Sequence, residues 1–327
     1  MQPCIYVSST WGIHDQRWQA ALQSLDFDVE VRCISLEIDD VQELRQQFES
    51  HISSDVPVLA GPLDAITKAL VGIPQRLVGL SWGFDMYRMD DLAWLSQLDA
   101  LILDSTETMD VARNVGVSET ALTLLPWGVD VTVFTPDGAV ADTTSWDLRD
   151  GANVILSLRA HEPLYRVADI LEAFSVIAGD DPNVVLIIGN TGSLTTELER
   201  QAERLGVLEQ VRFIGSLDED DLPALLRRAD AYVSASEVDG SSVTLLQAMA
   251  CGTPVVVSDT PGNLSWVTDG ETGFTFPVGD PHSLASALAR ATGQPHPSVR
   301  RSAITRVRHD ADWVANLQRL KSAMLGL

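Results

Sequence analysis

Residues 231–257 read AYVSASEVDGSSVTLLQAMACGTPVVV, and this stretch decides the fold. It holds an apolar strand, a polar turn rich in Gly and Ser, a helix and a second apolar strand. The turn Asp239-Gly240-Ser241-Ser242 brings small residues and an N-cap serine to the start of the helix. Because unpaired N–H groups and the positive end of the helix dipole meet there, the turn predicts an anion site.

Two polar side chains accompany this turn. Asp239 precedes the helix, and Gln247 lies eight positions later, about two turns inside it. Both can reach the mouth above the strand ends, where open α/β sheets bind ligands. A carboxylate and an amide beside a phosphate cradle suit the hydroxyl groups of a nucleotide sugar.

The rest of the chain alternates strand-length apolar runs with amphipathic stretches, the pattern of parallel βαβ units. Candidate strands in the first half are 4–8, 29–34, 56–60, 77–81, 100–103 and 121–125, with helical patterns such as 16–25 and 41–50. A second series comprises 153–158, 184–188, 211–214, 231–234 and 254–257. Two series in tandem predict an α/β protein with two Rossmann-like domains facing each other across a cleft.

The motif around the turn resembles the family 4 glycosyltransferases (glycosyl transferases group 1), which are retaining enzymes of the GT-B fold. Their signature is two acidic residues separated by seven, followed by a run similar to EAMA-G-PVV. Asp239, Gln247 and residues 248–257 stand in these places, although Gln247 replaces the usual Glu. The resemblance covers most of 151–290, through Gly262-Asn263, Trp266, Gly270, Gly273-Phe274 and Gly279-Asp280-Pro281, and the first 150 residues only loosely.

The resemblance also implies a domain plan. Residues 1–138 would form an acceptor-binding domain that ends at PWGVD and FTPDG, and the polar residues 139–150 a linker. Residues 151–309 would bind the nucleotide sugar. The final helical stretch, 310–327, would pack back toward the N-terminal domain.

The resemblance places the donor on the second domain. Arg159, at the end of strand 153–158, would bind the diphosphate, because its planar fork suits phosphate oxygens. Arg166 or Tyr165 falls near the position of a second basic contact. Asp239 would hold sugar hydroxyls as the catalytic carboxylate, and Gln247 would reach the ribose. The remaining implied contacts are Gly240, Ser241, Ser242 and Val243 at the phosphates, and Gly189, Asn190, Phe213 and Ile214 near the base.

Two loops of the first domain are candidates for the acceptor side. In the loop after the first strand, Gly12 allows close backbone approach, and His14 and Asp15 can meet the acceptor or a phosphate. Ordinary helix capping is the alternative role of Asp15. Trp82 and Asp85 follow the fourth strand. Many relatives have a His there that touches the transferred sugar, and this chain has none at that place.

Composition narrows the partners and the compartment. The formal net charge is −24, and only Lys68 and Lys321 are lysines, so nucleic acid and anionic lipid are unlikely partners. The acidic surface predicts either simple solubility or adaptation to high cytoplasmic salt, in which repulsion is screened. Three cysteines without CxxC spacing, no signal peptide and no transmembrane run predict a cytoplasmic protein.

Other site types lack their motifs. The sequence contains no GxxxxGK, GxGxxG, GxSxG or HExxH, and its six histidines are scattered. Two DxD triplets, at 26–28 and 218–220, lie at element junctions of an Asp-rich chain, so chance explains them. We therefore expect neither a cofactor nor a bound metal.

The sequence predicts a metal-independent retaining glycosyltransferase that uses a UDP-sugar or GDP-sugar, with UDP favoured. The acceptor would be a sugar, a glycan or a lipid-linked molecule. Two alternatives remain open: a nucleotide-sugar 2-epimerase on the same fold, and a catalytically silent nucleotide-sugar-binding protein. Gln247, the absent Lys and the missing His favour the silent protein.

Overall fold

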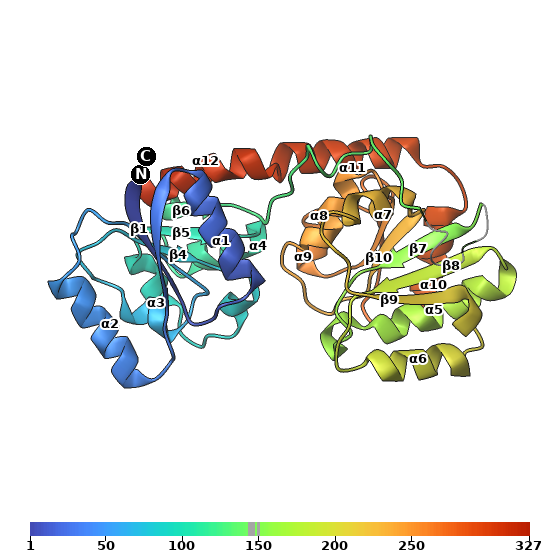
Figure 1. The fold of residues 1–327 in the computed structure, drawn as a ribbon, viewed down its shortest axis with the longest axis horizontal. Coiled ribbons are helices and arrows are strands. Elements are labelled where there is room, and N and C mark those ends of the chain that lie inside the picture. The colour runs from blue at the N-terminus through green and yellow to red at the C-terminus, as the bar shows by residue number, and fades with distance from the viewer. Residues whose placement is uncertain (143–147, 149–150) are drawn as a thin grey trace. The chain divides into compact units, whose positions relative to one another are not determined.

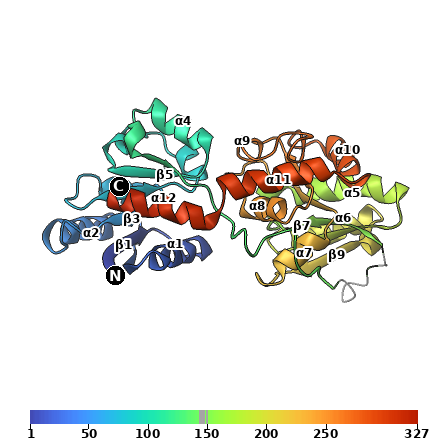
Figure 2. The same cartoon turned by 90° about the horizontal axis from the view of Figure 1, so that it is seen from above.

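The structure is a computed structural model that describes residues 1–142, 148 and 151–327, apart from the side chains of Ile13, Ile38 and Phe84. The chain forms two compact units (Figures 1 and 2): Met1–Trp127 with Trp313–Leu327, and Gly128–Asp312. Each unit contains one six-stranded parallel β-sheet with helices packed against it. The predicted α/β class with two Rossmann-like sheets is confirmed.

The sheet of the N-terminal unit has the strand order β2-β1-β3-β4-β5-β6. Its neighbouring strands all pair in parallel, so each connection must cross over the sheet. The strands are β1 (Gln2–Ser8), β2 (Phe27–Cys33), β3 (Val58–Ala60), β4 (Leu77–Leu80), β5 (Ala100–Leu103) and β6 (Leu122–Leu124). The helices are α1 (Ile13–Ser24), α2 (Ile38–Ser50), α3 (Ala65–Ala69), α4 (Thr106–Asn114) and α12 (Trp313–Leu325).

Alternation along β1 divides the N-terminal core between two faces. Ile5 and Val7 join the apolar cluster that α2, α3 and α4 complete. Tyr6 lies between them in sequence and contacts α1 instead, where its hydroxyl donates to Asp15. Residues of opposite parity along a strand face opposite sides, so both faces of this sheet are buried.

The sheet of the C-terminal unit has the order β12-β11-β10-β7-β8-β9, again with parallel pairing. The strands are β7 (Asn153–Ser157), β8 (Val184–Gly189), β9 (Val211–Gly215), β10 (Ala231–Ser234), β11 (Val255–Ser258) and β12 (Phe274–Phe276). The helices are α5 (Val167–Asp180), α6 (Thr195–Arg204), α7 (Leu222–Arg228), α8 (Val243–Ala250), α9 (Pro261–Leu264), α10 (Pro281–Thr292) and α11 (Pro297–Asp310).

Two apolar layers cover this second sheet (Figure 1). Helices α5, α6 and α10 pack on one face, against side chains such as Ile155 and Val233. Helices α7, α8 and α11 pack on the other, against side chains such as Leu156 and Tyr232. Because both faces are covered, the strands are continuous apolar runs, which is why they stand out in the sequence.

Most strand and helix bounds lie within about one helical turn of those that the sequence predicts. The predicted strands omit β12, and the helices named as examples do not include α11. Strand β12 has three residues, too few for a recognisable alternation. Helix α11 starts at Pro297 and is rich in arginine, so its apolar stripe is reduced to Val299, Ala303 and Val307.

The segment between the two sheets is divided differently from the predicted plan. Val129 and Phe134 pack in the core of the C-terminal unit, and the Val129 N–H donates to the carbonyl of Ala311 (2.8 Å). Of the predicted linker 139–150, residues 143–147, 149 and 150 lie outside the described residues. The final helix, α12, belongs to the N-terminal unit, where Asn316 donates to the carbonyl of Pro126 (3.0 Å).

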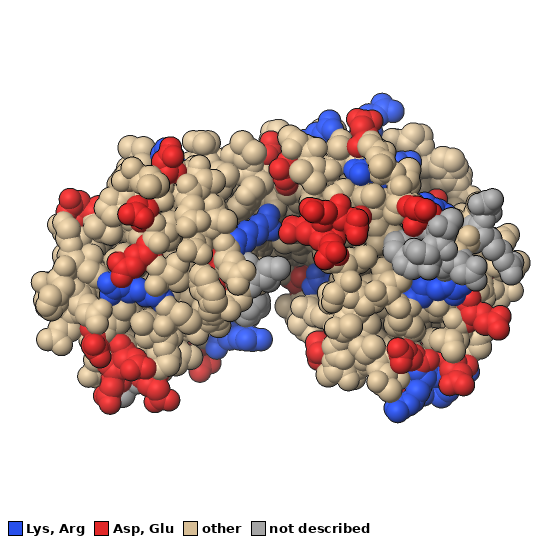
Figure 3. All heavy atoms as spheres, viewed as in Figure 1, with Lys and Arg blue, Asp and Glu red and all other residues tan. Residues whose placement is uncertain are grey.

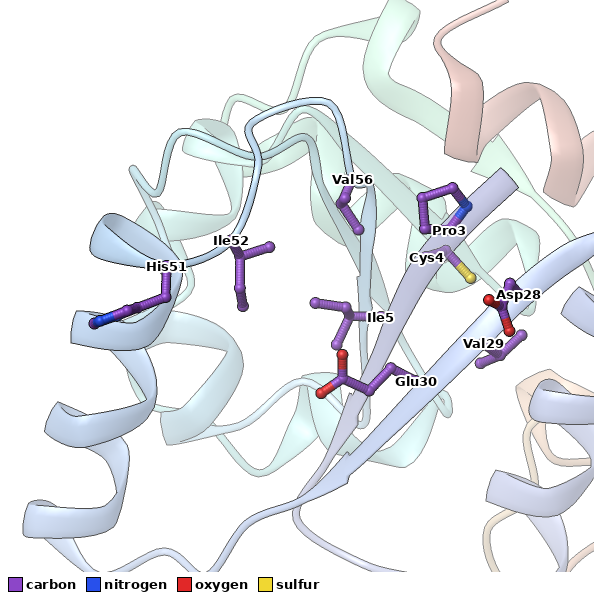
Figure 4. Close-up of a pocket in the computed structure, with 9 residues that line it drawn as sticks. All are labelled: Pro3, Cys4, Ile5, Asp28, Val29, Glu30, His51, Ile52 and Val56. Atoms are coloured by element: carbon purple, nitrogen blue, oxygen red, sulfur yellow. The ribbon is translucent and has the colours of Figure 1, made fainter. Parts of the chain in front are cut away.

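A surface hollow of about 390 Å³ opens beside the first strands of the N-terminal unit (Figure 4). Pro3 and Asp28, which line it, lie at the amino ends of β1 and β2. Open α/β sheets bind ligands at the carboxyl ends of their strands, so the hollow is at the opposite end from the expected site. Separately, every helix within the described residues is too short or too polar to cross a lipid bilayer.

Candidate functional site

The turn after β10 leads directly into α8, as the sequence predicts. Ser242 is the N-cap of α8, and its Oγ accepts a hydrogen bond from the N–H of Leu245 (3.5 Å). Val243 is the first helical residue, so the N–H groups of the first turn have few partners within the helix. This end of α8 therefore favours an anion at the carboxyl end of the sheet.

Arg159 reaches this turn from the end of β7. One guanidinium nitrogen, Nη1, donates to Ser242 Oγ (2.7 Å), and Nη2 lies 3.1 Å from Asp239 Oδ2 and 3.2 Å from Oδ1. The ring of Tyr165 covers the guanidinium at 4.3 Å. The side chains of Arg159 and Asp239 are only 12% and 11% exposed, so they form a largely buried ion pair beside the helix N-terminus.

Burial and pairing act in opposite directions on Asp239. Burial raises the pKa of the Asp239 carboxyl, and the neighbouring Arg159 guanidinium and Ser236 hydroxyl lower it in part. Burial thus disfavours the charged form of Asp239, and the ion pair with Arg159 favours it. The site thus holds one cation and one anion in direct contact.

Helix α9 packs closely against the same turn. Gly262 lies so close that a Cβ atom at its position would be 1.9 Å from the carbonyl oxygen of Asp239 and 2.5 Å from that of Gly240. Trp266 Nε1 donates to Ser241 Oγ (3.3 Å), which fixes the next residue of the turn. Only glycine permits this approach, so Gly262 sets the position of Asp239.

The second predicted cation is engaged elsewhere. Arg166 has φ 47° and forms ion pairs with Asp169 (2.7 Å) and Glu237 (2.5 Å). Tyr165, the alternative occupant of the predicted Lys position, stacks on Arg159 instead. Arg166 is therefore neutralised by two carboxylates, and Tyr165 covers Arg159. Of these three residues, it is Arg159 that bonds to the turn.

The residues expected near the base lie at the ends of β8 and β9. Gly189 ends β8, and Asn190 has φ 77° and donates its N–H to the carbonyl of Gly215 (2.6 Å). Phe213 and Ile214 are half-buried on β9. Their common position at the carboxyl ends of adjacent strands places these four residues on the same sheet edge as Arg159.

Gln247 lies in the second turn of α8 with 7% of its surface exposed. It is therefore buried on the same helix that starts at the Asp239 turn. Gly240 and Ser241 lie in the turn itself, and Val243 begins the helix. The structure thus brings the predicted phosphate-side residues together around one helix start.

In the N-terminal unit, Asp15 is fully buried and organises its own loop. It accepts hydrogen bonds from Tyr6 Oη (2.9 Å), Ser8 Oγ (2.6 Å), Thr10 Oγ1 (3.1 Å) and the N–H of Gly12 (2.7 Å). Gly12 is the N-cap of α1, and its N–H donates to the Asp15 carboxylate, which is the N3-to-N-cap half of a capping box. These contacts correspond to the capping role that was the alternative for Asp15.

Asp85 organises the loop after β4 in the same way. Its carboxylate accepts from Ser81 Oγ (2.6 Å) and from the N–H groups of Leu63 (2.9 Å) and Trp82 (2.8 Å). Burial raises the pKa of Asp85, and these hydrogen bonds partly offset the shift. Asp85 therefore positions Trp82 through its backbone.

His14 and Trp82 are brought into contact. The His14 ring lies 5.5 Å from that of Trp82 and 4.9 Å from that of Trp127. Trp127 also stacks on Trp18, and Arg17 lies over Trp127 at 5.0 Å. Burial lowers the pKa of His14, so its ring is neutral near pH 7. The result is an aromatic cluster at the carboxyl ends of β1, β4 and β6.

Sequence reasoning missed several participants. Trp127 stands in the PWGVD phrase, and nothing local marks it as a neighbour of His14. His161 is 1% exposed, bonds through Nδ1 to Thr195 Oγ1 (2.8 Å) and lies 6.2 Å from the ring of Phe213. Gly262 was recognised only as part of a motif. Each of these residues is identified by a contact with a residue far away in the sequence, which local patterns do not show.

The second sheet is parallel, and a helix N-terminus that favours an anion lies at its carboxyl edge. This arrangement is typical of nucleotide-binding α/β proteins. The chain belongs to the family "Glycosyl transferases group 1", whose model matches residues 141–309. Its fold is GT-B by structural likeness. It is similar to HepE from Anabaena in complex with UDP and glucose (TM-score 0.77, 16% identity, 99% of both chains). Sucrose-phosphate synthase from Thermosynechococcus elongatus is comparable (TM-score 0.77, 17% identity, 98% of both chains).

Curated relatives match over a shorter span. D-inositol 3-phosphate glycosyltransferase 2 of Catenulispora acidiphila is 30% identical over 208 residues, which are 61% of this chain and 49% of that protein. Phosphatidyl-myo-inositol mannosyltransferase of Mycobacterium tuberculosis is 33% identical over 203 residues, 62% of this chain and 47% of that protein. The chain thus spans about half the length of the curated relatives it matches.

Replacing Gly262 by alanine tests the close packing of α9 on the turn. The new methyl group overlaps the Asp239 carbonyl, so the turn must move, and we expect Gly262→Ala to cost about 1–3 kcal/mol of stability. Urea denaturation measures this. The control is Gly179→Ala in α5, where nothing lies within 4 Å of the added Cβ and stability should hold or rise. Equal stability of the two variants would contradict the packing argument.

Proposed function

We propose that this protein is a retaining glycosyltransferase that moves a sugar from a nucleotide sugar to an acceptor hydroxyl. UDP is favoured over GDP as the nucleotide, and no divalent metal takes part. One observation carries the proposal: the buried Arg159 guanidinium lies at the N-terminus of α8 with the Asp239 carboxylate beside it. Family membership supports the activity, and the UDP-glucose complex of HepE among the similar structures supports the nucleotide.

In this proposal the leaving diphosphate is stabilised by the C-terminal unit. The forked guanidinium of Arg159 binds phosphate oxygens, and the N–H groups at residues 240–243 add further donors. Such preorganised donors act where negative charge develops as the nucleoside diphosphate departs. Asp239 holds sugar hydroxyls, Gln247 reaches the ribose, and Gly189, Asn190, Phe213 and Ile214 approach the base.

The acceptor side is proposed for the N-terminal unit. His14, Trp82 and Trp127 present neutral aromatic rings at the carboxyl ends of its strands. Aromatic faces suit the C–H faces of a sugar ring, and the neutral imidazole offers a hydrogen bond to a hydroxyl. Asp15 and Asp85 hold the loops that carry His14 and Trp82. We propose a sugar, a glycan or a lipid-linked saccharide as the acceptor.

Donor binding is the first test. UDP-glucose at about a hundredfold excess over its Kd should stabilise the protein by roughly 2.7 kcal/mol, in EDTA as well as in Mg²⁺. For a unit of this size the gain corresponds to a rise in Tm of roughly 5–10 °C. Arg159→Ala should abolish most of the rise, because the diphosphate loses its cation. Arg301→Ala, an exposed arginine on α11, is the control for the charge change.

The outcomes separate the proposal from its alternatives. If UDP-glucose and GDP-glucose at millimolar concentration leave Tm unchanged, the donor-site assignment is wrong. Conversion of the donor sugar without any acceptor would favour the epimerase. Binding without turnover across a broad acceptor panel would favour the catalytically silent protein. The ion pairs that Arg159 and Arg166 already form are consistent with that alternative.

Trp82 tests the acceptor side. With an acceptor identified from a panel of monosaccharides, inositol and oligosaccharides, Trp82→Ala should raise the KM for that acceptor roughly tenfold, because a stacking face is lost. The KM for UDP-glucose should stay within about twofold. Trp82→Phe keeps an aromatic face and should show the smaller change. A selective rise in the donor KM would instead assign Trp82 to the donor.

We further propose that the acidic surface serves a cytoplasm of high salt. The net charge is −24, and Figure 3 shows carboxylates gathered in patches on the visible face of each unit. Their repulsion reaches about 10 Å at 0.1 M salt and about 3 Å at 1 M. Tm should therefore rise from 0.1 M to 1 M KCl. The rise should be smaller in a triple variant that combines Asp218→Asn, Glu219→Gln and Asp220→Asn. A flat or falling curve rejects salt adaptation.

A further inference from the structure

The hydroxyl group of Tyr232 is buried at the centre of the C-terminal unit. Tyr232 lies on β10, opposite Leu156 of β7, and none of its surface is exposed. Its ring packs in the apolar layer beneath α7 and α8. Within the part of the chain that the structure describes, Tyr232 Oη makes no well-aligned hydrogen bond, although Ser242 and Arg159 lie close to it. Burial raises the pKa of the hydroxyl to about 12, so the proton stays on the oxygen.

This hydroxyl lies beside the donor site. Arg159 and Ser242 are near enough to lower the pKa of Tyr232, and the Asp239 carboxylate acts in the opposite direction. The strand register agrees, since Leu156 pairs with Tyr232 and Arg159 follows on the same segment. The charged and titratable groups that face the hydroxyl are therefore Arg159 and Asp239, and the ring of Tyr165 covers the same guanidinium.

An unpaired acceptor accompanies this unpaired donor. Asp239 Oδ2 lies 3.1 Å from Arg159 Nη2, but among the described residues no aligned hydrogen bond to it is formed. A buried hydroxyl without a partner is destabilising, and phenylalanine would fill the same space without this cost. A second arrangement of the site that pairs these two groups would remove the cost.

Donor binding supplies that arrangement, and the step rests on the function proposed above. A diphosphate that uses the planar fork of Arg159 competes with Asp239 for the same N–H groups. Asp239 is 11% exposed and would then lose its partner while still having to remain ionised to hold the sugar. We infer that Tyr232 is a positioning residue, whose hydroxyl hydrogen-bonds Asp239 when the donor phosphates engage Arg159.

Removal of the single oxygen atom in Tyr232→Phe tests this role. The variant should be as stable as the unaltered protein or more so, because the hydroxyl makes no well-aligned hydrogen bond before the donor binds. Its affinity for UDP should fall less than its affinity for UDP-glucose, because without a sugar to hold, Asp239 can take up a proton when the diphosphate engages Arg159. Its affinity for UDP-glucose and the kcat for UDP-glucose hydrolysis, with water as acceptor, should fall roughly tenfold or more, as expected for a lost hydrogen bond to a charged group.

The pH dependence supplies a readout that a packing role would leave unchanged. A hydrogen bond to the ionised carboxylate lowers its pKa, so Tyr232→Phe should move the acid limb of kcat to higher pH. Thr253→Val is the matched control. Thr253 has a buried hydroxyl that donates to the Leu226 carbonyl beyond the far end of α8. That variant should lose stability and keep the acid limb of the unaltered protein.

Calorimetry with UDP on the unaltered protein comes first, and absence of binding would overturn the donor site and this inference together. If UDP binds and Tyr232→Phe matches the unaltered protein in UDP-glucose affinity, kcat and acid limb, only the role of Tyr232 is overturned. A fall in Tm and kcat with an unmoved acid limb likewise overturns it, because that pattern marks a structural hydroxyl. A stable variant with a selective loss for UDP-glucose and a shifted limb supports it.

Discussion

The buried ion pair between Arg159 and Asp239 is the contact on which the proposed donor site depends. It connects the end of β7 to the turn before α8, and the hydrogen bond from Arg159 to Ser242 extends the connection to the helix N-cap. Losing one partner of a buried pair leaves an uncompensated charge, which costs about 3–5 kcal/mol. The conformation of the turn and the position of the guanidinium are therefore coupled. Gly262 completes the arrangement from the side of α9.

Buried carboxylates organise loops in both units. Asp15 and Asp85 each collect several N–H or O–H groups at the carboxyl end of a strand of the N-terminal sheet. An ionised carboxylate offers about four acceptor positions, so one side chain can fix a whole loop. Asp239 differs, because its main partner is a cation that a phosphate ligand would also attract. Asp15 and Asp85 therefore have partners that a phosphate would not attract, whereas the main partner of Asp239 is one that it would.

The features that local sequence determines were predictable, and those that tertiary contacts determine were not. The strands, the turn at Asp239 and the Ser242 cap follow from alternation and capping chemistry within a few residues. The placement of Arg159 at a strand end follows from the strand itself. The pairing of Arg166 with Glu237 spans 71 positions, and the contact of His14 with Trp127 joins the segment after β1 to the segment after β6. No local pattern carries either of these contacts.

Gly12 illustrates how an occupied backbone group changes what a loop can do. Its N–H already donates to Asp15 at 2.7 Å, and that carboxylate is enclosed by three further donors. An incoming anion would have to displace the Asp15 carboxylate, which accepts four hydrogen bonds. The N–H of Gly12 is therefore already occupied by Asp15 and is not available to bind an anion. The groups beside it are the half-exposed indole of Trp11 and the imidazole of His14, which offer ring surface instead of charge.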